Sequence, residues 1–206
     1  MPLRKALAPV GGRLSRLRIA ALAAAILAMP GPPASGRAEP PEALVPCLSC
    51  HGDKGTSEIE NVPALGAQRA PYTLIQLFMF REGMRVAEPM NDFAKPLSDD
   101  DLRMAADFMA KLPPPRPADV PVEAARMEQG RALAQTHRCE FCHRPDWSGQ
   151  ESVPRLSGQR EDYLLKTLRD YKSGARRGYE ATMAEALQPL DDAALVELAY
   201  YIARAR

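Results

Sequence analysis

The sequence predicts an all-α protein made of two similar halves that follow an N-terminal leader. Two observations support this fold class: a set of motifs recurs once along the chain, and no segment has the alternating or β-branched pattern of a strand. The 206 residues are 46% hydrophobic but only 6% aromatic, and the 20 prolines are expected to separate helices rather than interrupt them.

The first 38 residues have the features of a secretory signal peptide, in the expected order. A basic segment precedes an apolar run from Ile19 to Met29, and a Pro/Gly/Ser stretch then ends at Ala38. The run is shorter than the roughly 20 residues that cross a bilayer. We therefore expect cleavage near Ala38 and export, with an uncleaved amphipathic anchor as the alternative.

Removing the leader changes the charge of the protein. It contains six of the 27 Lys and Arg residues and none of the 26 Asp and Glu residues, which leaves 21 basic against 26 acidic residues, a net charge of −5. A mildly acidic, exported chain lacks the basic surface of a nucleic-acid-binding protein, so that class is excluded.

The internal repeat shows that one structural unit is used twice. Cys47-Leu48-Ser49-Cys50-His51 returns as Cys139-Glu140-Phe141-Cys142-His143, with an offset of 92 residues. Other pairs keep an offset of 91 to 93 residues: Pro63 with Pro154, Gln68 with Gln159, Tyr72 with Tyr163, Arg85 with Arg176, and Met90 with Met183.

A proline-rich segment separates the two units. Lys111 to Val122 contains five prolines in twelve residues, which favours an extended and semi-rigid spacer. The predicted organisation is a signal peptide at 1–38, a first domain at 39–112, a linker at 113–121 and a second domain at 122–206.

Start signals place the longer helices. Pro71 suits the first turn of a helix that runs to about Arg81. Ser98 with Asp101 resembles a capping box, and its counterpart helix is expected to start near Asp191. A further helix is predicted over 123–136, directly before the second Cys pair.

All four cysteines lie in the two C-x-x-C-H motifs, Cys47/Cys50 and Cys139/Cys142. Two thiols one helical turn apart can bond the two vinyl groups of one haem, while the adjacent histidine presents a nitrogen to the iron. The motifs therefore predict two covalently attached haem c groups, with a buried haem supplying the apolar mass that each small domain lacks. A zinc site or two redox disulfides are the weaker alternatives.

The histidine count limits the axial ligands of the haem iron. There are three histidines, and two bis-histidine haems would need four. With His51 and His143 as proximal ligands, His137 lies too close to Cys139 to reach the far face of its own haem and is expected to face solvent.

Methionine is therefore the expected distal ligand in both halves, because Met/His ligation is the cytochrome c arrangement. Met183 is the only methionine after the second motif. In the first half the repeat selects Met90, since Met90 and Met183 stand at the same distance before a Pro-Leu pair. Met84 is the one rival, whereas three others have helical spacing and are expected in the core: Met79, Met104 and Met109.

Pro63 and Pro154 follow the haem histidines by twelve and eleven residues. A backbone carbonyl there can accept the histidine ring N–H and adjust its strength as a ligand, or each proline can simply turn a loop.

From Pro41 to its C-terminus the chain resembles the cytochrome c4 family of bacterial dihaem cytochromes. The resemblance is carried by these segments and residues: 153–159, 163–176, Met183 and 190–202 in the second half, and Pro63, Leu65, Gln68, Tyr72, 80–85, Met90 and 97–100 in the first. It implies two tandem class I cytochrome c domains packed face to face, each enclosing one covalently attached haem, with Arg85 and Arg176 either near the haem propionates or merely exposed.

The resemblance also implies function: a periplasmic electron carrier between respiratory donors and a terminal oxidase or other acceptor, with possible peripheral association with membrane complexes. We expect no catalytic residues, because two six-coordinate haems leave no open iron for a substrate. The first half has only Glu39 to Pro46 before Cys47, where the family has a helix. That short start makes a haem subunit of a dehydrogenase complex, such as flavocytochrome c sulfide dehydrogenase, the alternative.

Overall fold

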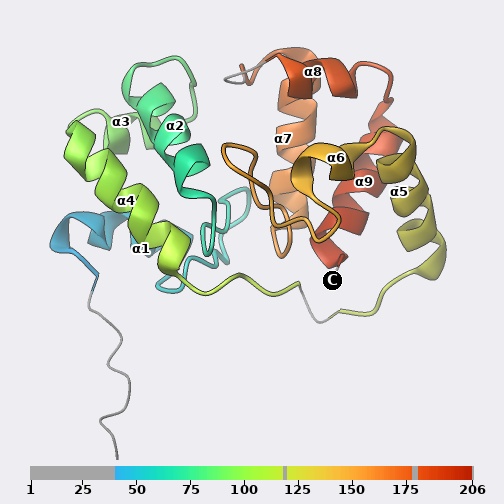
Figure 1. Cartoon of the computed structure of the whole chain (residues 1–206), viewed down its shortest axis with the longest axis horizontal. Coiled ribbons are helices and arrows are strands. Elements are labelled where there is room, and N and C mark those ends of the chain that lie inside the picture. Colours follow the sequence, from blue (N-terminus) through green and yellow to red (C-terminus); the bar gives the residue numbers. More distant parts are fainter. Residues whose placement is uncertain (1–39, 118–119, 178–180, 206) are drawn as a thin grey trace, which may run out of the picture. The chain divides into compact units, whose positions relative to one another are not determined.

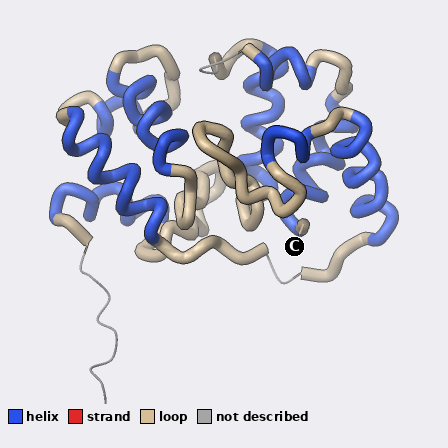
Figure 2. The backbone as a smooth tube through the Cα atoms, viewed as in Figure 1, coloured by secondary structure: helices blue, strands red, loops and turns tan. Residues whose placement is uncertain are grey.

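The computed structural model describes residues 40–117, 120–177 and 181–205. The predicted signal peptide and its cleavage site lie outside these residues. Within the described ranges the regular structure is helical (Figure 2). One isolated β-bridge there joins Gln150 to Val153. The predicted all-α class is confirmed.

The last four helices of each half follow the same order, which can be traced along the colour ramp of Figure 1. The first half contains a 3₁₀-helix η1 (Glu42–Leu44), α1 (Val45–His51), α2 (Ala70–Arg81), α3 (Met90–Ala94) and α4 (Asp99–Lys111). The second half contains α5 (Ala124–Thr136), α6 (Cys139–His143), α7 (Glu161–Ser173), α8 (Thr182–Leu187) and α9 (Asp192–Arg204).

Three helices begin where the sequence predicted, at the expected capping residues and proline. Ser98 and Asp101 form a complete capping box at the start of α4, in which the hydroxyl accepts from the Asp101 N–H and the carboxylate accepts from the Ser98 N–H. Asp191 caps α9 by accepting from the Ala194 N–H at 2.8 Å. Pro71 lies in the first turn of α2, where its missing N–H removes no helical bond.

The core of the second half forms where α5 crosses α9. A side chain at Gly130 would place its Cβ 2.3 Å from the Tyr201 Cβ and 2.5 Å from the Glu197 carbonyl oxygen, so only glycine permits this approach. Trp147 is buried against the Tyr201 ring, edge-on, with the ring centres 5.9 Å apart.

The first half lacks a counterpart of α5 among the described residues, because only η1 and the short α1 precede α2. Many of its buried core residues come from α2 and α4, among them Met79, Phe80, Leu102 and Met109. This confirms the short start that the sequence indicated.

No helix of the described chain combines the length and the apolar character that a membrane crossing requires.

We predict that Gly130→Ala lowers the free energy of unfolding by about 1–3 kcal/mol, because the new methyl group forces α5 away from α9. Chemical denaturation of the haem-loaded protein measures the effect. Gln135→Ala, on an exposed position of the same helix, is the control and should change stability by less than about 0.5 kcal/mol. Equal losses in both variants would contradict the close-packing role of Gly130.

Candidate functional site

Both C-x-x-C-H motifs lie on short helices, α1 and α6, that end at their histidines. This places the two cysteines of each motif about one turn apart, with the histidine at the C-terminal end. All four cysteines are free thiols and partly buried, and the two pairs belong to different halves of the chain. The spacing therefore suits two separate attachment sites rather than one shared metal site.

Each motif histidine is held by the prolyl carbonyl that follows it along the chain. His51 Nδ1 lies 2.8 Å from the Pro63 oxygen, and His143 Nδ1 lies 3.1 Å from the Pro154 oxygen. Since a carbonyl only accepts, Nδ1 carries the proton in both rings and Nε2 keeps its lone pair. The carbonyl role suggested by the sequence is confirmed, and the prolines do more than turn a loop.

Burial also keeps both imidazoles neutral. It lowers the pKa of His51 and of His143, and the hydrogen bonds to Pro63 and Pro154 offset this only in part. A buried, neutral ring with one nitrogen anchored and the other unprotonated is the form that ligates a metal.

Two glutamines connect these loops across the halves, a role that the sequence analysis did not assign. Gln159 bonds both backbone groups of Ala64, and Gln68 bonds both backbone groups of Arg155. The signal available in the sequence was their recurrence at corresponding positions of the repeat. Recurrence alone does not show that each glutamine reaches the opposite half.

Two arginines form a second connection between the halves. Arg176 donates to the Tyr72 hydroxyl at 2.7 Å and to the Gln76 Oε1 at 3.1 Å. Arg85 donates to the same Gln76 oxygen at 2.5 Å and to the Tyr163 hydroxyl at 3.4 Å. Arg176 is only 5% exposed, so the view that it is an ordinary surface arginine is wrong.

This cluster is electrostatically incomplete within the described residues. The hydrogen-bond partners of Arg176 there are phenol, hydroxyl and amide oxygens and no carboxylate, and its buried Nε has no hydrogen-bond acceptor. Burial alone would raise the pKa of the Tyr163 phenol, but the charges of Arg176 and Arg85 outweigh burial and lower that pKa to about 7. A buried positive charge is costly without an anion, so this place suits a carboxylate-bearing group such as a haem.

The two candidate distal ligands occupy corresponding helices. Met90 begins α3 and Met183 lies in α8, and both side chains are partly buried. Met79 and Met109 belong to the core of the first half, as the sequence predicted. Met84 is 57% exposed.

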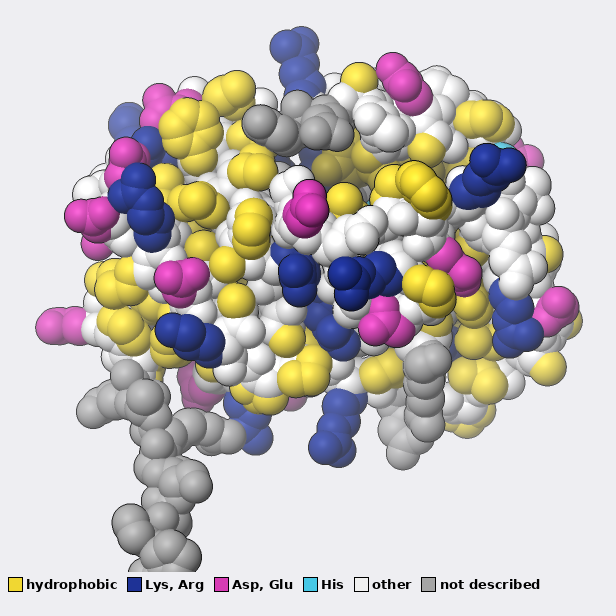
Figure 3. Space-filling model, in the orientation of Figure 1, with side chains coloured by type: hydrophobic (Ala, Val, Ile, Leu, Met, Phe, Trp, Pro, Cys, Tyr) yellow, Lys and Arg dark blue, Asp and Glu magenta, His cyan; other side chains and the backbone are white. Residues whose placement is uncertain are grey.

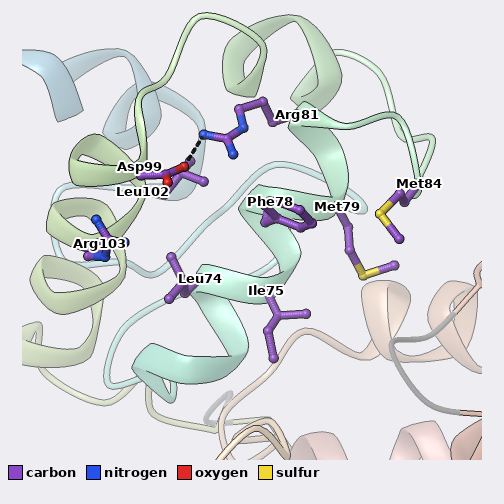
Figure 4. Close-up of a pocket in the computed structure, with 9 residues that line it drawn as sticks. All are labelled: Leu74, Ile75, Phe78, Met79, Arg81, Met84, Asp99, Leu102 and Arg103. Atoms are coloured by element: carbon purple, nitrogen blue, oxygen red, sulfur yellow. Dashed lines mark hydrogen bonds and ion pairs between the residues drawn. The ribbon is translucent and has the colours of Figure 1, made fainter.

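Met84 lines an apolar groove between α2 and α4, together with Met79 and Phe78 (Figure 4). No residue of the haem motif lines this groove. His137, expected at the surface, is instead partly buried at the end of α5, where it lines a shallow pocket with Leu133 and Leu190.

No protein-family model matches the chain, but comparison with individual proteins identifies its family. It is 35% identical over 145 residues to cytochrome c4 of Azotobacter vinelandii, a match that covers 63% of this chain and 69% of that protein. It is also 32% identical over 123 residues to a thiosulfate dehydrogenase electron acceptor of Stutzerimonas stutzeri, covering 50% of this chain and 57% of that protein.

The fold comparison agrees with the sequence match. The structure of reduced recombinant cytochrome c4 from Pseudomonas stutzeri superimposes with a TM-score of 0.71 and 28% identity, covering 79% of this chain and 95% of that chain. The paired C-x-x-C-H helices, their anchored histidines and these matches lead to one conclusion: the chain belongs to the cytochrome c4 family of dihaem electron carriers and carries two covalently bound haem c groups.

Proposed function

We propose that the chain is an exported electron carrier with two closed, six-coordinate haems. The first haem is held by Cys47, Cys50, His51 and Met90, and the second by Cys139, Cys142, His143 and Met183. The observation that carries the proposal is the geometry at both histidines, where the prolyl carbonyl takes Nδ1 and leaves Nε2 for the iron.

The cysteines bind the cofactor covalently. On attachment each thiol would add across one vinyl group, its sulfur bonding one vinyl carbon and its hydrogen passing to the other, so that Cys47 with Cys50 and Cys139 with Cys142 would each hold one haem by two thioether bonds. A bound haem would supply one-electron redox chemistry. The protein residues set the affinity of each iron for that electron and keep water away from it.

Met90 and Met183 are the distal ligands in this proposal. They stand in equivalent helices of the repeat, whereas Met84 is largely exposed and Met79 belongs to the core. With both distal positions filled by thioethers, neither iron has a vacant site for a substrate, so the protein transfers electrons and performs no reaction of its own.

Arg85 and Arg176 are proposed to bind haem propionates. Arg176 is buried, its Nε has no hydrogen-bond acceptor among the described residues, and none of its partners in the cluster is a carboxylate. An anion at this place would therefore be stabilised. A propionate would supply that anion and would connect the haem to both halves, since the cluster already joins Tyr72 to Arg176 and Tyr163 to Arg85.

The predicted leader supports a periplasmic location, where respiratory proteins would donate and accept electrons. Redox proteins of this type form transient complexes, and the donor would be a dehydrogenase or membrane complex with a terminal oxidase or other protein as acceptor. The acidic balance of the mature chain speaks against nucleic acid as a partner.

A second candidate function is a haem subunit of a dehydrogenase complex. Several large apolar side chains of the first half, the half without a described counterpart of α5, are exposed. They include Val45, Phe78, Met84, Val86 and Phe93. The face in Figure 3 shows such apolar side chains between charged ones. The similarity to a thiosulfate dehydrogenase electron acceptor points the same way.

Affinity purification of the tagged protein from its native periplasm distinguishes the two candidates. A free carrier should elute alone at moderate salt, because transient redox complexes dissociate. Stoichiometric retention of a flavin- or haem-containing dehydrogenase through gel filtration would favour the subunit role and would contradict the free-carrier proposal.

The optical spectrum of the mature protein tests the closed sites. We expect two haems per chain, sulfur-to-iron absorption in the oxidised form, and no carbon monoxide binding in the reduced form. Met90→Ala should allow carbon monoxide to bind one haem of the two, because it opens one iron. Met84→Ala is the matched control and should leave both haems closed, and a reversed pattern would exchange the roles of Met90 and Met84.

Arg176→Met tests the propionate proposal. Removing a buried positive charge near a haem stabilises the ferric state, so we expect the affinity for an electron to fall by on the order of 1 kcal/mol. Spectroelectrochemical titration measures the midpoint potentials. Arg103→Met is the control, because that side chain is 60% exposed and its charge is screened. Unchanged potentials in Arg176→Met would contradict propionate binding there.

A further inference from the structure

Gln159 and Gln68 make the same pair of hydrogen bonds in opposite directions across the two halves. Gln159 Oε1 accepts from the Ala64 N–H at 2.8 Å, and its Nε2 donates to the Ala64 oxygen at 2.9 Å. Gln68 Oε1 accepts from the Arg155 N–H at 2.8 Å, and its Nε2 donates to the Arg155 oxygen at 3.0 Å. Each glutamine therefore clamps one residue of the other half.

The clamped residues directly follow the prolines that anchor the histidines. The Ala64 N–H and the Pro63 carbonyl belong to one peptide group, and so do the Arg155 N–H and the Pro154 carbonyl. A continuous chain of two hydrogen bonds thus runs from the His51 Nδ1–H to the Pro63 carbonyl and from the Ala64 N–H of the same peptide group to Gln159. The equivalent path runs from the His143 N–H to Gln68.

Both glutamine side chains are fixed in orientation. Gln68 Oε1 also accepts from the Arg69 N–H at 2.9 Å, and Gln159 Oε1 also accepts from the Arg160 N–H at 3.0 Å. Each oxygen therefore faces two N–H donors while each Nε2 faces a carbonyl, and exchanging the two ends of the amide would break all of these bonds. Both side chains are buried, at 4% and 7% exposure, so water does not substitute for them.

Such a path has an electronic consequence for the histidine. An acceptor on the N–H side of a peptide group polarises it and makes its carbonyl oxygen a stronger acceptor. A stronger acceptor on Nδ1–H raises the donor strength of Nε2 toward a metal. A stronger ligand favours the ferric state, so the glutamine should lower the reduction potential of the haem it reaches.

We propose that Gln159 and Gln68 tune the haems crosswise: Gln159 of the second half tunes the first haem through Pro63 and His51, and Gln68 of the first half tunes the second haem through Pro154 and His143. Both glutamines are positioning residues and touch neither iron nor haem ligand directly. The inference rests on the proposed axial roles of His51 and His143.

The experiment uses the mature, haem-loaded full chain and its Gln159→Met and Gln68→Met variants, each serving as the control for the other. Redox titration followed by proton NMR gives a midpoint for each haem, once its signals are assigned through residues near Cys50 or Cys142. We expect Gln159→Met to raise the reduced-to-oxidised ratio of the first haem by about threefold, which corresponds to roughly 28 mV, and to leave the second haem unchanged. Gln68→Met should do the reverse.

Two further measurements separate tuning from general loosening of the contact between the halves. In the reduced protein, the His51 Nδ1 proton signal should move upfield in Gln159→Met only, as its hydrogen bond weakens. Gln159→Glu keeps an acceptor for the Ala64 N–H. Because the carboxyl is buried and its second oxygen faces the Ala64 carbonyl, it should stay protonated and donate there, so the first-haem potential should stay close to that of the unsubstituted protein. If Gln159→Met fails to fold, Gln68→Met tests the same effect in the other direction.

The outcomes are distinct from those of the functional proposal. Equal shifts at both haems, a shift confined to the haem of the substituted half, or a first-haem shift in Gln159→Glu as large as that in Gln159→Met would overturn crosswise tuning, even with two closed haems. Carbon monoxide binding by the unsubstituted protein would overturn the proposed ligation together with this inference.

Discussion

The hydrogen bond between the histidine of each C-x-x-C-H motif and its prolyl carbonyl is the constraint on which the rest of the site depends. It sets the tautomer of His51 and His143, and it fixes the loops that carry Pro63 and Pro154 beside α1 and α6. Burial of the rings removes water that would otherwise compete for Nδ1. With this acceptor in place, each histidine presents an unprotonated Nε2 beside the two thiols of its short helix.

The same loops connect the halves, so the two haem sites are not independent units. Gln159 and Gln68 hold the residues that follow the two prolines, while Arg176 and Arg85 meet phenols of the opposite half. Buried polar contacts of this kind are costly when only partly satisfied, which favours one fixed arrangement of the two loops. A change in one half can therefore reach the histidine of the other through few bonds.

The repeat is not used symmetrically. The second half builds its core on the close crossing of α5 and α9 at Gly130, whereas only the three-residue η1 precedes α1 among the described residues of the first half. Positions on α2 also differ: Phe78 faces an apolar groove, while its counterpart Arg169 pairs with Asp192 at 2.7 Å. The first half thus has more exposed apolar surface, which suits contact with another protein.

The sequence by itself determined the helical class, the attachment motifs and most helix starts, because spacing, capping residues and proline positions act locally: the Ser98–Asp101 box and the Pro71 start both occur as predicted. It left open whether Pro63 and Pro154 accept from the histidines or only turn their loops, and the structure decided for the acceptor role. Only the tertiary structure decided that Gln68 and Gln159 cross between halves, that Arg176 is buried and that His137 is partly covered. The glutamine and Arg176 contacts join residues 87 to 104 positions apart in the sequence, and no local pattern encodes that pairing.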